Sequence, residues 1–333
     1  NVESQSSSYS NALSADAVPP SHSSWITCSQ TTPEGELKLQ LVTRPGCTVY
    51  RLNRGPLGKG FNLLWREGKL SRPSTKGDKL VQRHNPALKA QAIDQRISKG
   101  PLLNSILTEP EQDPHDPSTI DPVFLVAPRV TDGLYLLPVA VNPLLAIGEL
   151  GSNLELPPPT LPASSKNGPS GSNYWQGVRA AALSAAELLI ARSTRELDVD
   201  HRSLEAVEPR PFQMEGALLP LVQIVDAHVN GAGFSAWLGD ERQGQPPILK
   251  FIHQCLSEEA EQWSELGHRN ECQDSCYSCL KTYENQNVHG LLDWRLALCY
   301  LRAFVQPDWH CGLDGDYNWS PLRDWPDQAE QVA

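Results

Sequence analysis

The sequence lacks long apolar runs, and it holds a single methionine, Met214. No stretch approaches the roughly 18 consecutive apolar residues that a membrane-spanning helix needs. The first residues, NVESQSSSYSNALSADAVPPSHSS, also lack the apolar segment of a secretory signal peptide. These absences predict a cytoplasmic protein. Because the chain starts at Asn1 and has so little methionine, we expect a processed or excised part of a longer protein.

Motifs of nucleotide-driven motors and common hydrolases are also missing. GPLGKG (55–60) falls short of a phosphate-binding loop, because Asn53 and Gly60 stand where the motif needs Gly and then Ser or Thr. There is no GxSxG elbow, no HExxH and no convincing carboxylate pair. The sequence therefore encodes no motor and favours a protein without enzymatic activity of its own.

One turn keeps an enzymatic alternative open. VDAHVNGAGF (225–234) follows a predicted strand, and its glycines permit a close backbone approach to an anion. A nuclease or hydrolase would use Asp226, His228 and this turn. The simpler interpretation is a tight connection between a strand and a helix.

Charge is distributed unevenly along the chain. From Arg44 to Lys99 there are 13 Lys and Arg against 3 Asp and Glu, within a chain whose net charge is −11. Aromatic side chains interleaved with cations suit stacking on single-stranded nucleic acid, although a solvated loop explains the pattern equally well. The candidate nucleic-acid-binding residues are Arg51, Arg54, Lys59, Trp65 and Arg66.

Composition divides the chain into four parts. Residues 1–24 are polar and predict a disordered tail, 25–155 are rich in strand patterns and contain the basic segment, 156–172 form a Pro-, Ser- and Gly-rich linker, and 173–333 form an α/β region.

Hydrophobic periodicity predicts an α+β fold with a mixed sheet, packed helices and a short Cys-rich segment before the last long helix. We expect strands within 25–66 and at 218–227, and two strands, 122–128 and 133–141, joined by a turn at 131–133. The expected helices cover 86–97, 173–196, 247–266 and 288–305.

Three of the eight cysteines are crowded into HRNECQDSCYSC (268–279), as Cys272, Cys276 and Cys279. Together with His268 they offer four ligands that can reach one tetrahedral ion, which predicts a structural Zn2+ site. A redox pair or unmetallated thiols are the alternatives. The fourth ligand remains open between His268 and Cys255, because Cys255 lies on the apolar face of its predicted helix.

The C-terminal half resembles a known family. CQDSCYSCLKTYENQNVHGLLDWRLAL (272–298) and HCGLDGDYNW (310–319) are similar to the C-terminal zinc-binding domain of the MrfA type, which is associated with DEAD/DEAH-box helicases. Similarity extends upstream through 172–206 and 221–234, and more weakly through 124–136 and 49–64. A CxxCG knuckle that some members carry is replaced here by LLWREG (63–68).

The resemblance implies a zinc-binding, helicase-associated module with ligands at Cys272, Cys276 and Cys279. Such domains occur in DNA-repair helicases and in anti-phage defence systems of the DISARM and Druantia types. The implied partners are a DEAD/DEAH-type helicase, on the same chain or as a separate subunit that supplies the ATPase activity, and DNA in single-stranded or partially duplex form. A structural scaffold within a defence complex is a further alternative.

Overall fold

The computed structural model describes residues 12–16, 24–33, 35–53, 64–66, 69–72, 79–80, 91–94, 123–140, 171–214, 217–241, 244–312 and 314–327. The chain divides into two compact units. The first comprises residues 1–19, 47–130 and 150–165, and the second comprises 20–46, 131–149 and 166–333. The predicted linker at 156–172 lies outside the described residues, except for residues 171 and 172, which begin α2 (Gly171–Leu197).

The described residues of the first unit are strands. β1 (Ala12–Asp16), which falls in the predicted tail, pairs with residues 49–53 of β3, and β7 (Gln91–Asp94) pairs with residues 123–126 of β8. A separate small sheet contains β4 (Leu64–Arg66), β5 (Lys69–Arg72) and β6 (Lys79–Leu80). The prediction of a helix over 86–97 is wrong at residues 91–94, which form β7. Their pairing with β8 overrides a local pattern that also fits a helix.

The second unit is built on an antiparallel sheet. β2 (Ile26–Thr32) pairs with β3 (Gly35–Asn53), and β11 (Ala217–Asp226) pairs with β8 (Val123–Pro138), β10 (Arg210–Met214) and β9 (Leu204–Ala206). Along the path of paired strands, β3 is followed by β8, β11 and β10. The α+β class is confirmed. Every pair of strands with a described register is antiparallel, so the expected parallel component of the sheet does not occur among them.

Residues 131–133 do not form the predicted turn. β8 continues through them as one strand, and Gly133 pairs with Val225 of β11. The Thr131 side chain is fully buried, and its hydroxyl donates to the carbonyl oxygens of Asp226 at 2.7 Å and His228 at 3.0 Å. The Thr-Asp-Gly sequence is typical of a turn, but here these long-range bonds hold it extended.

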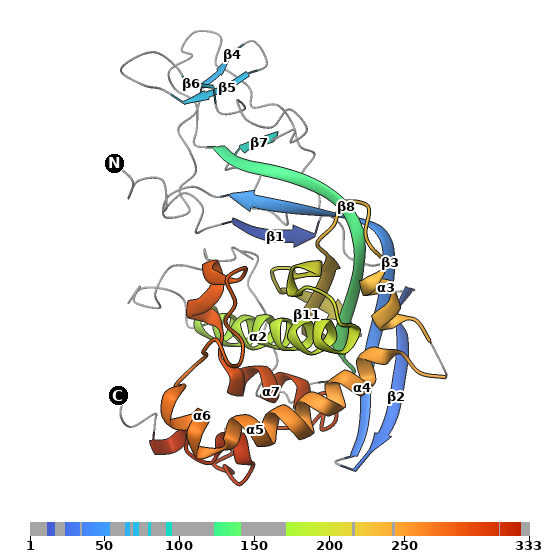
Figure 1. The fold of residues 1–333 in the computed structure, drawn as a ribbon, viewed down its shortest axis with the longest axis vertical. Helices are drawn as coiled ribbons and strands as arrows, with labels where there is room; N and C mark the ends of the chain where they lie inside the picture. The colour runs from blue at the N-terminus through green and yellow to red at the C-terminus, as the bar shows by residue number, and fades with distance from the viewer. Residues whose placement is uncertain are drawn as a thin grey trace. The chain divides into compact units, whose positions relative to one another are not determined.

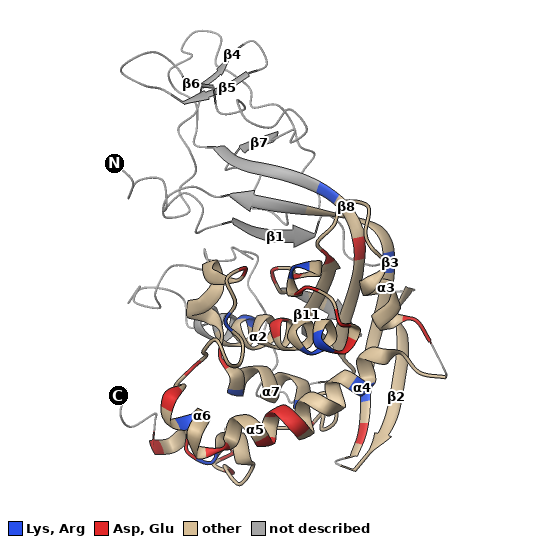
Figure 2. Cartoon of the chain, in the orientation of Figure 1, with Lys and Arg blue, Asp and Glu red and all other residues tan. Residues whose placement is uncertain are grey.

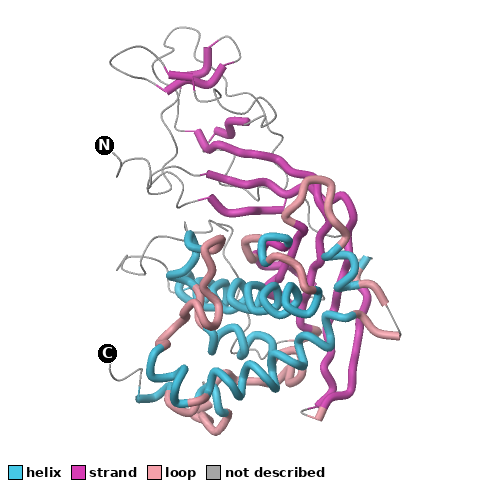
Figure 3. Tube along the Cα trace, viewed as in Figure 1, coloured by secondary structure: helices cyan, strands magenta, loops and turns pink. Residues whose placement is uncertain are grey.

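Helices pack together beside this sheet (Figures 1 and 3). α2 (Gly171–Leu197), predicted from its apolar face, contacts β11 and α7 (Trp294–Arg302). The shorter helices are η4 (His201–Ser203), α3 (Phe234–Gly239), α4 (Pro247–Gln254), η6 (Gln286–Leu291) and η7 (Ser320–Leu322). The core contains fully buried apolar side chains from sheet and helices alike, including Leu134, Leu136, Leu189, Val222, Ile252 and Leu298.

The predicted helix over 247–266 bends before the Cys-rich segment. α4 continues through a π-helical turn, η5 (Cys255–Glu259), into α5 (Ala260–Ser264). Glu265 is extended, with ψ of 145°, and α6 (Leu266–Glu271) starts after it. This break at Glu265 gives the following turn, which carries His268, its own direction.

The last long helix is shorter than expected because Asp293 caps it. α7 starts at Trp294, and the Asp293 carboxylate accepts from the amides of Arg295 at 2.7 Å and Leu296 at 3.1 Å. An acidic cap of this kind satisfies amides that have no partner within the helix. The Cys-rich segment precedes this helix, as predicted.

Candidate metal centre

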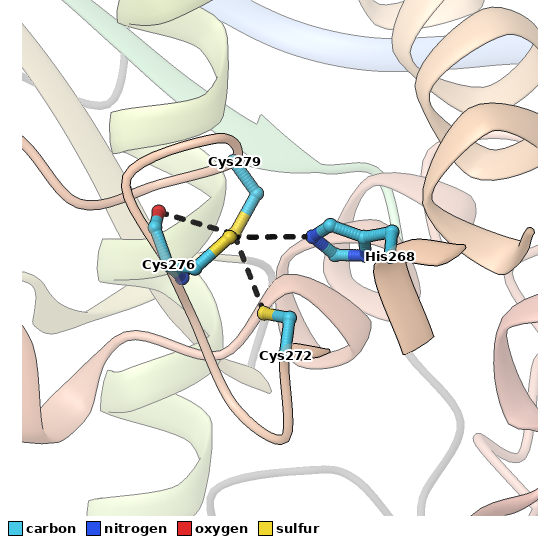
Figure 4. A group of neighbouring side chains, drawn as sticks. All are labelled: His268, Cys272, Cys276 and Cys279. Atoms are coloured by element: carbon cyan, nitrogen blue, oxygen red, sulfur yellow. Dashed lines mark hydrogen bonds between the residues drawn. The ribbon is translucent and has the colours of Figure 1, made fainter. Parts of the chain in front are cut away.

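Four side chains converge beside α6 and the loop that follows it (Figure 4). They are His268, Cys272, Cys276 and Cys279, and their candidate ligand atoms all lie within 4.8 Å of one another. The Cys279 sulfur is 3.8 Å from that of Cys272 and 3.7 Å from that of Cys276. The Cys276 sulfur is 3.6 Å from Nε2 of His268. This group could hold one metal ion.

The imidazole of His268 is oriented by the backbone. Its Nδ1 lies 3.0 Å from the carbonyl oxygen of Trp263, at the end of α5. A carbonyl only accepts, so this contact requires the proton on Nδ1 and leaves the Nε2 lone pair directed at the sulfurs. An outer hydrogen bond that fixes the tautomer is typical of histidines that bind metals.

The loop from Cys276 to Lys281 forms a turn around the sulfur of Cys279. The Cys276 amide donates to that sulfur at 3.1 Å. The Cys276 carbonyl accepts from the amides of Cys279 at 3.2 Å and Lys281 at 2.9 Å. These bonds close the turn. One N–H, that of Cys276, is directed at the Cys279 sulfur. An N–H donor stabilises a thiolate, the form in which cysteine binds metal.

The thiols share their protons unequally. The hydrogen bond with Cys272 lowers the pKa of Cys279 to about 5, outweighing burial, and the Cys276 amide and His268 act in the same direction. The same contact raises the pKa of Cys272.

Large side chains enclose the site on the helical side. Cys272 is buried, and the His268 ring stacks on Trp263 with centroids 6.0 Å apart and meets Trp294 edge-on at 5.5 Å. Both indoles are buried. These aromatic contacts limit the rotation of the imidazole and exclude water from one side of the ligand group.

Cys255, the alternative fourth ligand, is not part of this group. It is fully buried in η5, and burial raises its thiol pKa well above the ordinary value. Coulombic repulsion from Glu259 adds to that effect. A thiol in this state behaves as a small apolar side chain.

The backbone amides of the turn after Asp226 bind the Asp226 carboxylate itself. Asp226 is fully buried, and its two oxygens accept from the amides of Ala232, Phe234 and Ser235 and from the Ser235 hydroxyl, at 2.6 to 3.1 Å. The amides that were expected to suit an anion therefore bind Asp226. With four donors on one carboxylate, Asp226 has no free oxygen for a metal, and His228 is exposed outside this network.

The candidate nucleic-acid residues stay predictions. Arg51 lies in β3, and Trp65 and Arg66 lie in β4, but only their backbone is described. Arg54 and Lys59 lie outside the described residues. Within the described part of the second unit, acidic residues follow one another through η5 and α5, at Glu258, Glu259 and Glu261 (Figure 2).

Comparison with known proteins gives one distant likeness. The chain is similar to a crystal structure of the DUF1998 helicase MrfA bound to DNA, with a TM-score of 0.33 and 11% sequence identity. The match covers 88% of this chain and 24% of the helicase, so the chain spans about a quarter of that protein's length. No family model matches the chain, and no curated protein matches it. Among the described residues, no helix is both long and apolar enough to cross a membrane.

Proposed function

We propose that the chain is a non-motor accessory module of a DNA helicase, stabilised by one zinc ion. In this role it helps the helicase engage DNA and assemble with its partners, in anti-phage defence or DNA repair in the cytoplasm. The single observation that carries the proposal is the convergence of His268, Cys272, Cys276 and Cys279.

Distances within the group support zinc. A tetrahedral Zn2+ with Zn–S near 2.3 Å and Zn–N near 2.0–2.1 Å places its sulfurs about 3.8 Å apart and sulfur and nitrogen about 3.6 Å apart. The Cys279 sulfur is 3.8 and 3.7 Å from the other two sulfurs, the Cys276 sulfur is 3.6 Å from Nε2 of His268, and all four ligand atoms lie within 4.8 Å of one another. Three sulfurs and one imidazole also form a donor set that zinc uses in structural sites.

A structural role suits the site better than a catalytic one. Catalytic zinc keeps one position for water or substrate, whereas here the protein supplies four ligands. The ion would join α6 to the loop before α7. Binding of the metal would therefore contribute directly to folding of this part of the chain.

The helicase and DNA components of the proposal are supported by sequence. The block 272–298 resembles the helicase-associated domain, and the chain encodes no motor motif of its own. Arg51, Arg54 and Lys59 in the basic segment are the residues proposed to contact DNA, together with Trp65 and Arg66.

Metal content tests the first component. Elemental analysis of protein purified without chelator is expected to give about one zinc per chain. The Cys276→Ser variant is expected to lose the zinc, while Cys255→Ala should keep it. Folded protein without any metal would contradict the proposal.

DNA engagement tests the second component. A fluorescent single-stranded oligonucleotide is titrated with the chain in the presence and in the absence of a DEAD/DEAH-type helicase. Charge reversal at Arg51, Arg54 and Lys59 should weaken binding and reduce its salt dependence. Unchanged affinity would remove these residues from the DNA surface, and failure to associate with the helicase would contradict the accessory role.

A further inference from the structure

A carboxylate far along the chain connects the two segments that carry the candidate metal ligands. Asp324 follows η7 in the C-terminal segment, and its Oδ2 accepts from Arg269 Nε at 3.0 Å and from Arg295 Nη2 at 3.1 Å. Its Oδ1 pairs with Arg269 Nη2 at 2.5 Å. One carboxylate thus binds two guanidinium groups: it accepts one hydrogen bond from each arginine, and a second ion-pair contact with Arg269 adds to the first.

Each arginine holds backbone next to a candidate metal ligand. Arg269 follows His268 on α6 and also donates to the Ser264 carbonyl at 3.4 Å. Arg295 donates from Nη1 to the carbonyl of Gln273 at 2.6 Å, and Gln273 follows Cys272. The first arginine therefore holds the helix of the histidine ligand, and the second holds the start of the cysteine loop.

The second arginine also contacts the aromatic wall of the site. The Arg295 guanidinium lies 4.2 Å from the centroid of the Trp294 ring, the ring that meets His268 edge-on. Arg295 is 1% exposed, so it is a buried cation whose charge requires a partner. Asp324 supplies the negative charge.

Packing holds Asp324 in place from its own side. Pro321 and Leu322 of η7 are buried, and Leu322 packs in a cluster with Cys299 and Trp309. η7 also contacts α5, the helix that ends beside the site. The C-terminal segment is thus seated on the same helices that present the ligands.

From this geometry we propose that Asp324 is a positioning residue of the metal site. It aligns α6 with the cysteine loop through Arg269 and Arg295, so the affinity for metal depends on docking of the segment 320–327. The inference rests on the metal-binding part of the proposed function. Because coupling between two events is reciprocal, metal in the site also stabilises docking of this segment.

Zinc affinity of the full-length chain is the test. Zinc is withdrawn by competition with a chromophoric chelator, and its affinity and release rate are compared for wild type and Asp324→Asn. The variant should bind zinc about tenfold more weakly, the lower end of the effect known for residues behind metal ligands. Arg295→Lys, which keeps the charge but not the two-pronged geometry, should fall between the two.

Two controls separate positioning from loss of charge or stability. Asp327→Asn removes the same charge from an exposed position of the same segment. Glu208→Gln weakens a buried ion pair, 2.7 Å long, that Glu208 forms with Arg179 of α2. Both should bind zinc as wild type does. Wild-type affinity in folded Asp324→Asn would overturn the proposal.

Hydrogen exchange covers the case in which Asp324→Asn fails to fold. In wild type, removal of zinc should accelerate exchange of the Leu322 amide, which donates to Trp319 at 2.9 Å, by about the same factor as the lost coupling. If chelation removes the zinc and the exchange rate of this amide does not change, the coupling is rejected. The proposed zinc site would still stand, because the purified protein contained zinc. Absence of zinc from the purified wild type would instead reject the proposed function itself.

Discussion

Two loops of the second unit each gather polar atoms, but with different outcomes. The Asp226 loop, residues 226–235, places a carboxylate inside a ring of donors, so its polar atoms bind one another. The cysteine loop, residues 272–285, carries three sulfurs that lie close to one another and to Nε2 of His268 on α6. In the first loop hydrogen-bond donors surround one carboxylate, whereas at the cysteine loop four candidate ligand atoms lie close to one another, and that clustering is what marks a possible metal site.

The largest expected effect is at the cysteine loop. Cys276→Ser removes one ligand, and a structural zinc contributes on the order of 10 kcal/mol to folding in small zinc domains. We expect loss of zinc and melting of the α6–α7 region, measured by elemental analysis and circular dichroism. Cys255→Ala is the matched control and should retain both zinc and structure. Intact zinc and unchanged melting in Cys276→Ser would contradict the comparison.

At the other loop, Asp226→Ala should lower stability without touching the metal. It leaves the amides of Ala232, Phe234 and Ser235 without their acceptor, which should cost about 4 kcal/mol in the free energy of unfolding. Urea denaturation measures the loss, and the zinc content should remain that of wild type. A fall in zinc content in the folded variant would mean that the two loops are not independent.

A buried glutamate makes the far end of the cysteine loop sensitive to pH. Glu187 on α2 accepts from Asn285 at 3.0 Å, and burial raises its pKa from 4.5 to about 7, with Glu205 adding repulsion and the Asn285 hydrogen bond opposing both. The folded state then holds a proton that the unfolded chain has released. Glu187 therefore costs stability progressively as pH rises from about 4.5 to about 7.

Glu187→Gln should remove that cost while keeping an acceptor for Asn285. We expect the variant to be more stable than wild type by about 2 to 3 kcal/mol at pH 8, and the difference to vanish near pH 4.5. Urea titrations at both values measure it. A gain that is the same at both pH values would show that the ionisation of Glu187 is not its cause.

The smallest effect is expected at His228. Its side chain is exposed, and its backbone carbonyl accepts from Thr131 and Gly231, bonds that a substitution of the side chain keeps. His228→Ala should therefore change stability by less than about 0.5 kcal/mol. Metal-dependent cleavage of DNA by the purified chain, abolished in this variant, would revive a hydrolase in place of the structural turn.

Local chemistry was predictable from sequence, whereas long-range pairing was not. His268 and the three cysteines lie within twelve residues, so their spacing alone indicated a shared ion. The same holds for α2 and β11, whose apolar patterns are long. Residues 131–133 and 91–94 misled because their neighbours in β11 and β8 decide their conformation.

The supporting residues of the site show the same limit. Asp324 is 55 positions from Arg269, and no spacing rule connects them. The carbonyl of Trp263 that orients His268 is a backbone atom, which carries no sequence pattern at all. The glycines after Asp226 left an anion site open beside the simpler strand-to-helix connection; the fold has that connection, from β11 to α3, and its amides bind the Asp226 carboxylate.

X-ray absorption at the zinc edge on the purified chain tests the central claim most directly. The account predicts one zinc per chain with three sulfur ligands near 2.3 Å and one nitrogen ligand near 2.0–2.1 Å, the nitrogen being lost in His268→Ala. A shell of four sulfurs would place another cysteine in the site and contradict the role of His268. A folded chain without zinc would contradict the account as a whole.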